Sequence, residues 1–127
     1  MAAIASRKQE HVEIAVQRDV AFEQTTSSFE QYGFEHNALP ELNFEDVNPA
    51  TEFLSVPLSF PLMVSGMTGG YADAERINGM LAEVCEDARI AIGSGSQRQV
   101  RENEEFVSTY TILRKMAPSV PVIANIG

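Results

Sequence analysis

Residues 62–70 read LMVSGMTGG and residues 90–98 read IAIGSGSQR, and these two stretches decide the fold. Each begins with an apolar run and passes into a loop rich in glycine and hydroxyl side chains. The last six residues, VIANIG, form a third run. Short apolar runs bounded by Gly or Pro are typical of buried strands. The predicted strands are Leu62–Ser65, Ile90–Gly93 and Val122–Ile126.

Helical patterns fill the two intervals between the predicted strands. Apolar residues recur there at spacings of three and four, which places them on one helical face. The first helix carries Ala74, Ile77, Leu81, Val84 and Ala88, and the second carries Phe106, Tyr110, Leu113 and Ala117. Asp73 and Asn103 are candidate N-caps, and Pro118 ends the second helix. The order strand–helix–strand–helix–strand predicts an α/β fold with parallel strands.

Two architectures have this strand spacing, the doubly wound sheet and the (β/α)₈ TIM barrel. Both bind ligands beyond the carboxyl ends of their strands. The loops at residues 65–70 and 93–98 supply flexible backbone and hydroxyls, and Arg98 is suited to grip a phosphate. Asn125 can hydrogen-bond a planar heterocycle. Tight turns, a solvated loop arginine and an amide that satisfies its own backbone are the alternative interpretations.

The first sixty residues are acidic and irregular, so we divide the chain into an arm and lead-in segment at 1–60 and β/α units at 61–127. Ser6 and Gln9 form a capping-box pattern, which predicts a helix start. Alternating Val12, Ile14 and Val16 favour a strand instead. Arg7 and Lys8 would lie in the first helical turn, where the helix dipole opposes positive charge by ~0.3–1 kcal/mol. Residues 52–60 are expected to be extended.

Composition excludes several classes of protein. The 127 residues carry 18 acidic side chains and 9 basic ones, a net charge of −9, so non-specific nucleic-acid binding is not expected. The single Cys85 allows no intrachain disulfide and is expected in the core, which favours a cytoplasmic location. No apolar run reaches the ~18 residues of a membrane span. We find no metal-ligand cluster or nucleophile triad, and His36 is interpreted as a loop or packing residue.

Five segments together resemble one enzyme family, type 2 isopentenyl-diphosphate delta-isomerase. In chain order they are 7–11, 36–41, 67–70, 95–98 and 117–127. The resemblance implies an FMN-containing TIM barrel that interconverts isopentenyl and dimethylallyl diphosphate by a 1,3-proton shift. It implies NADPH as the flavin's reductant, Mg²⁺ on the diphosphate, and a homo-oligomer. The reduced flavin would be acid and base, so no catalytic side chain is identified.

The same resemblance implies roles for individual residues. The implied flavin contacts are Ser65, Gly66, Met67, Thr68, Ser96 and Asn125, and the implied substrate contacts are Arg7, Lys8, Ser96, Gln97 and Arg98. No role is assigned to His11, and no metal ligand is expected in this chain.

The sequence departs from the family at Ser94, where an apolar residue is expected, and at Arg89, where a glycine is expected to end the helix. A Cβ strains a left-handed helix end, so a reshaped end is the expectation. Family chains are more than twice as long, so we expect a truncated chain that is inactive alone. Another FMN-binding TIM-barrel oxidoreductase and a non-catalytic fragment that acts by association are the alternatives.

Overall fold

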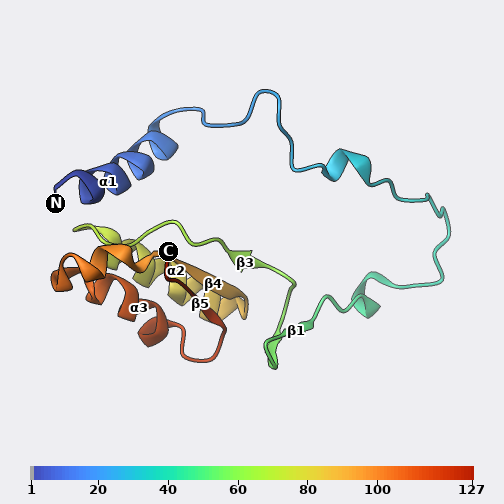
Figure 1. Ribbon diagram of the computed structural model, residues 1–127. Helices are drawn as coiled ribbons and strands as arrows, with labels where there is room; N and C mark the ends of the chain where they lie inside the picture. Colours follow the sequence, from blue (N-terminus) through green and yellow to red (C-terminus); the bar gives the residue numbers. More distant parts are fainter. Residues whose placement is uncertain (1) are drawn as a thin grey trace.

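The computed structural model describes residues 2–127, with side chains from Ser6 onward. Figure 1 shows an N-terminal helix, α1 (Ala2–Gln17), a long extended stretch, and a packed unit formed by the second half of the chain. Residues 18–50 contain two 3₁₀ turns, Phe29–Gln31 and Phe44–Asp46, and their side chains are exposed. None of the helices in the described part combines the length and apolar composition that crossing a membrane requires.

A parallel three-stranded sheet forms the centre of the packed unit. It consists of β3 (Met63–Val64), β4 (Ala91–Ser96) and β5 (Val122–Asn125), in that order. Ile92 of β4 pairs with Val64 on one side and Val122 on the other. The three predicted strands are therefore confirmed, and β4 continues to Ser96 rather than ending at Gly93. The α/β class with parallel strands is confirmed as well.

Helices α2 (Ala74–Ala88) and α3 (Ser108–Met116) pack against each other and cover one face of this sheet. Both contribute to one core together with β4, formed by Ala82, Cys85, Ile92, Leu113, Ala117 and Val120. Cys85 is buried in this core, as predicted, and burial raises the pKa of its thiol. Parallel strands with both crossover helices on one face are typical of α/β units.

The predicted core face of α2 is confirmed at Ala74, which is buried, and at Leu81, which packs against the core, and it is wrong at Val84. Val84 is 60% exposed, whereas Asn78 and Ala82 are buried beside Ala74 and Cys85. The small side chains at these positions let α3 approach closely, so shape rather than the largest apolar residues selects the buried face.

A β-hairpin replaces the extended lead-in that the sequence predicts. Strand β1 (Thr51–Phe53) pairs antiparallel with β2 (Val56–Leu58) through a two-residue turn at Leu54 and Ser55. Both turn residues have positive φ angles, 52° and 60°. Leu58 is buried, and a hollow of about 310 Å³ lies between the hairpin and residues 61–63 and 91.

The predicted N-terminal helix is confirmed, but its predicted start and the alternative strand are wrong. Helix α1 begins at Ala2, so Ser6 lies inside it rather than at an N-cap, and the strand over residues 12–16 is not formed. The start AAIA is rich in alanine, the strongest helix former, which carries the helix past the capping-box pattern. Arg7 and Lys8 are therefore beyond the first turn, where the opposing dipole has faded.

The capping predictions have mixed outcomes. Asp73 precedes α2 without a side-chain cap, because its carboxylate is held by the Arg76 guanidinium at 2.9 and 2.8 Å. Asn103 caps the short 3₁₀ turn Glu104–Phe106 that leads into α3. Arg89 adopts the left-handed conformation with φ 52° and ψ 52°, and its N–H donates to the Cys85 and Glu86 carbonyls. The helix end keeps the glycine-type geometry and is not reshaped.

Candidate functional site

The loop that follows β3 lies directly against the last residues of β4 at the carboxyl end of the sheet. The Gly95 N–H donates to the Thr68 carbonyl at 3.0 Å. A Cβ on Gly95 would lie 2.6 Å from the Thr68 oxygen and 2.7 Å from the Met67 oxygen. A Cβ on Gly66 would overlap the Ser94 carbonyl. Glycine at these two positions permits the contact of backbone with backbone.

A buried polar cluster fixes the first loop to both helices. Asn78 of α2, 2% exposed, accepts a hydrogen bond from the Thr68 hydroxyl. Its amide donates to the Thr109 carbonyl of α3 at 2.6 Å. The Thr109 hydroxyl in turn accepts from the Gly70 N–H at 3.1 Å. Because these groups are buried and mutually paired, the loop has one defined position.

Lys8 connects α1 to the first loop and to the end of β4. Its ammonium donates to the Gly69 carbonyl at 2.8 Å, the Ser96 carbonyl at 2.9 Å and the Tyr110 hydroxyl at 3.1 Å. The nitrogen also lies 5.7 Å from the centre of the Tyr110 ring, within cation–π range. Partial burial lowers the pKa of Lys8. Of the predicted substrate contacts on the arm, Lys8 reaches the loops, while Arg7 is exposed, as is His11.

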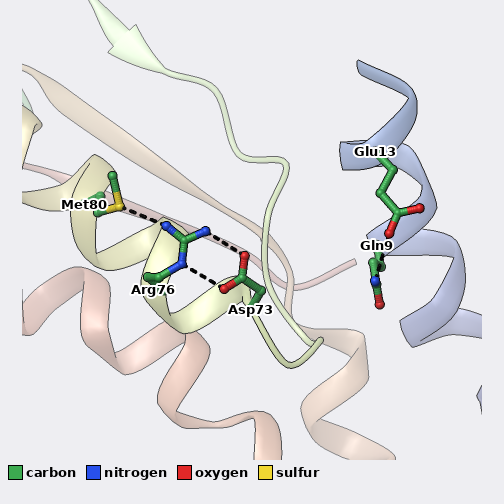
Figure 2. A network of polar contacts seen from close by, with 5 residues as sticks. All are labelled: Gln9, Glu13, Asp73, Arg76 and Met80. Carbon is green, nitrogen blue, oxygen red and sulfur yellow. Dashed lines mark hydrogen bonds and ion pairs between the residues drawn. The ribbon is translucent and has the colours of Figure 1, made fainter. Parts of the chain in front are cut away.

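Helix α1 and the start of α2 border a small hollow of about 180 Å³. Gln9 and Val12 line it from α1, and Tyr71 and Ile77 line it from the other side. Figure 2 shows the polar side chains of this region. Gln9 donates to Glu13 within α1, and Asp73, Arg76 and Met80 interact within the α2 segment.

The residues after β4 and β5 also come together. Ser96 ends β4, and its hydroxyl accepts from the Arg98 N–H at 3.4 Å. A Cβ on Gly127 would lie 3.5 Å from the Arg98 guanidinium and 3.6 Å from the Ser96 hydroxyl. Hollows of about 350 and 200 Å³ adjoin the side chains of Arg98 and Arg101. Of the predicted substrate residues, Ser96 is thus the last residue of β4, paired with Asn125 of β5, and Gln97 and Arg98 follow it directly.

The side chains at the proposed flavin positions differ in what they leave free. Ser65, Gly66 and Met67 are exposed, and so is Asn125. The Asn125 side-chain oxygen accepts a hydrogen bond from the Gly127 N–H at 3.1 Å, so this amide satisfies nearby backbone, which was the alternative interpretation of Asn125. The Thr68 hydroxyl donates to Asn78 and the Thr68 carbonyl accepts from Gly95, so the hydroxyl oxygen can still accept a hydrogen bond but its hydrogen is not available to a ligand. His36 lies in the exposed stretch before the hairpin.

Ser94 has a function in the sheet that explains its departure from an apolar residue. The pairing of β4 with β5 is irregular between Gly93 and Ser96. The buried Ser94 hydroxyl accepts from the Asn125 N–H at 3.2 Å, which satisfies a backbone donor at that irregularity.

Sequence reasoning missed Asn78, Thr109 and Tyr110 as parts of the site. Tyr110 was placed only on an apolar helix face, and Asn78 lies one position from the predicted face. A polar side chain in the middle of an otherwise small and apolar stripe was the available signal. Among the described residues no group of three or more His, Cys, Asp or Glu side chains is arranged to hold a metal ion.

No protein-family model matches the chain. Curated proteins named isopentenyl-diphosphate delta-isomerase do match. The protein from Pelodictyon phaeoclathratiforme is 46% identical over 121 residues, 95% of this chain and 34% of the relative. Those from Chlorobium phaeobacteroides and Metallosphaera sedula are 47% and 43% identical over 95% and 98% of this chain. They are covered over 33% and 34% of their own lengths.

The chain therefore spans about a third of the length of the curated relatives that it matches. The resemblance that the five segments predict is confirmed, because these relatives carry the name isopentenyl-diphosphate delta-isomerase. Their names do not state whether they are of type 2.

Proposed function

We propose that this chain is the N-terminal part of a type 2, FMN-dependent isopentenyl-diphosphate delta-isomerase. The observation that carries the proposal is the similarity to proteins of that name over 95% of the chain. The structure supports it because Ser96 and Asn125, the last residues of β4 and β5, and the loops after β3 and β4 lie at one end of one sheet.

A (β/α)₈ barrel is the proposed complete architecture. In such a barrel helices cover the outside of a parallel sheet and apolar side chains fill the inside. Here α2 and α3 cover one face, and the hairpin borders the other near the amino ends of the strands. Met63 of β3, which pairs with Ala91, is 52% exposed. This partly uncovered face would be the barrel interior.

The cationic side chains at the carboxyl end suit a diphosphate. Lys8, Arg98 and Arg101 lie there in a chain whose net charge is −9, so positive charge is concentrated where the ligand is proposed to bind. Arg98 can form two parallel hydrogen bonds with phosphate oxygens. We assign Arg7, Lys8, Ser96, Gln97 and Arg98 to substrate binding. Lys8 would act through its positive charge, because its three hydrogens have acceptors in Gly69, Ser96 and Tyr110.

The residues at the proposed flavin positions fit a flavin. Ser65 and Asn125 offer exposed polar groups and Met67 an exposed apolar side chain, 62% accessible, which suits a ring system with polar edges and apolar faces. Ser65, Gly66, Met67, Thr68, Ser96 and Asn125 would hold it. When bound and reduced, the flavin supplies the proton donor and acceptor, NADPH keeps it reduced, and Mg²⁺ binds the diphosphate.

The isomerisation adds a proton at one end of an allylic unit and removes one from the other end, with no net redox change. An unactivated alkene is a poor base, so the reacting carbons must be held close to the proton donor. The task of this chain's residues is to anchor the diphosphate and fix the loops. The Asn78 cluster performs the second part by holding Thr68 and Gly70 in place.

The test is a chimera in which residues 1–127 replace the matching third of the Pelodictyon relative. A chimera made with the Chlorobium phaeobacteroides segment is the matched control. With FMN, NADPH and Mg²⁺ we expect conversion of isopentenyl to dimethylallyl diphosphate by both chimeras, and none by the 127-residue chain alone.

A folded, flavin-binding chimera of this chain that is inactive while the control is active would refute the proposal. Oxidation of a hydroxy acid by that chimera would favour an FMN oxidoreductase instead. We further propose that the complete enzyme is cytoplasmic and forms a homo-oligomer. Size-exclusion chromatography of the chimera with light scattering would test the oligomeric state.

A further inference from the structure

Tyr110 closes a small ring of hydrogen bonds around the end of the Lys8 side chain. The Lys8 ammonium donates to the Ser96 carbonyl and to the Tyr110 hydroxyl, and that hydroxyl also bonds the Ser96 carbonyl, at 2.8 Å. An ammonium only donates hydrogen bonds, so the hydroxyl oxygen accepts from Lys8 and its proton points to Ser96. The hydroxyl must therefore be present and protonated for the ring to form.

The Tyr110 ring fits beneath the first loop as well. A Cβ on Gly69 would collide with ring carbons of Tyr110, and one on Gly70 would lie 2.9 Å from its hydroxyl oxygen. Tyr110 itself is buried, with 7% exposure. Its position is thus fixed by packing, and the hydroxyl lies at one place between the first loop and the end of β4.

The Lys8 ammonium has three hydrogens, and Gly69, Ser96 and Tyr110 provide three acceptors. Two of them are backbone carbonyls that no side-chain substitution removes. Tyr110 is the one acceptor of this set that comes from a side chain, and it adds the ring face 5.7 Å away.

We propose that Tyr110 is a positioning residue that holds Lys8, and with it helix α1, at the diphosphate end of the site. The proposal rests on the proposed function for its catalytic consequence, since Ser96 directly precedes Gln97 and Arg98. Tyr110 touches no substrate; it acts through the ammonium of Lys8. Loss of its hydroxyl releases α1 and leaves the sheet, the core and Arg98 in place.

The first test needs no substrate. Tyr110→Phe removes the hydroxyl and keeps the ring, and Tyr71→Phe is the matched control, because the buried Tyr71 hydroxyl has no hydrogen-bond partner among the described residues. Trypsin cleavage of the 127-residue chain after Lys8 is followed by mass spectrometry. Cleavage after the exposed Arg18 and after Lys115 of α3 provides internal references.

In the unsubstituted chain and in Tyr71→Phe we expect cleavage after Lys8 to be much slower than after Arg18. Tyr110→Phe should accelerate cleavage after Lys8 roughly tenfold, the effect of losing one hydrogen bond to a charged group. Cleavage after Lys115 should not change. Equal cleavage at Lys8 and Arg18 in the unsubstituted chain, no acceleration in Tyr110→Phe, or a parallel increase at Lys115 would each overturn the proposal.

The second test uses the chimera described above. Tyr110→Phe should raise KM for isopentenyl diphosphate roughly tenfold with kcat within about twofold, whereas Tyr71→Phe should change neither. A fall in kcat with KM unchanged would overturn the positioning role. If the parent chimera had no turnover, the proposed function would fail, while the trypsin experiment would still decide whether Tyr110 holds Lys8.

Discussion

Substitution of Arg89 by glycine should make the protein more stable. Arg89 ends α2 at φ 52° and ψ 52°, a conformation that costs a residue with a Cβ about 1–2 kcal/mol. Its backbone bonds to Cys85, Glu86 and Ser59 do not involve the side chain and survive the change. Glycine also loses more conformational entropy on folding than arginine does, which lowers the free energy of unfolding by about 0.5–1 kcal/mol. The expected net gain in the free energy of unfolding is about 1 kcal/mol.

Urea denaturation of the 127-residue chain, followed by circular dichroism, measures this gain. With a slope of about 1–3 kcal/mol per molar urea, Arg89→Gly should raise the midpoint by roughly 0.5 M. Arg89→Ala is the control, because it removes the guanidinium and keeps the Cβ. Equal midpoints for the Gly and Ala variants would refute the assignment of backbone strain to Arg89.

Three further outcomes are expected. Asn78→Ala removes the buried amide that donates to the Thr109 carbonyl, so the free energy of unfolding should fall by about 2–3 kcal/mol. A loss below about 0.5 kcal/mol in urea titrations would contradict the stabilising role of this polar cluster. Hydrogen bonds from Ser119 lower the pKa of the Glu86 carboxyl, so Glu86 stabilises the fold above the ordinary Glu pKa, and this contribution is lost as pH falls through the lowered value. The melting temperatures of the unsubstituted chain and of Glu86→Gln should therefore differ at pH 7 and converge in acid, as pH falls below the ordinary Glu pKa, and a difference that stays constant with pH would argue against this role of Glu86. Arg98→Ala in the chimera should reduce kcat/KM for isopentenyl diphosphate by at least about tenfold without loss of flavin. Turnover at low substrate concentration and flavin absorbance measure these two quantities. Unchanged turnover would show that Arg98 does not bind the substrate.

The regular part of the fold was predictable because its signals are local. Residues 62–65, 90–93 and 122–126 are apolar runs between glycines and prolines, and each became a strand. The hairpin was missed because its turn uses Leu54 and Ser55, whereas positive φ angles are usually signalled by Asn or Gly. The start of α1 was misplaced because alanine propensity outweighed a capping pattern, a competition between two local effects of similar size.

The candidate site was predictable only in part. The rule that ligands bind beyond the carboxyl ends of parallel strands correctly placed Ser96, Arg98 and the glycine-rich loops at one end of the sheet. It could not reveal what holds them there. Asn78 and Tyr110 act through contacts with residues far away in the sequence, and no periodicity encodes such a pair. The loops were visible in the sequence, but their supports were not.

The contact of Lys8 with Tyr110 spans 102 residues and that with Ser96 spans 88, which sets an order of events during synthesis. Helix α1 is synthesised before its acceptors, and Gly69 follows Lys8 by 61 residues while Ser96 and Tyr110 follow much later. Until α3 is made, Lys8 lacks part of its acceptor set, and closing so long a loop carries an entropic cost that grows with its length. Helix α1 is therefore expected to dock late, after β3, β4 and α3 have assembled the surface that receives it.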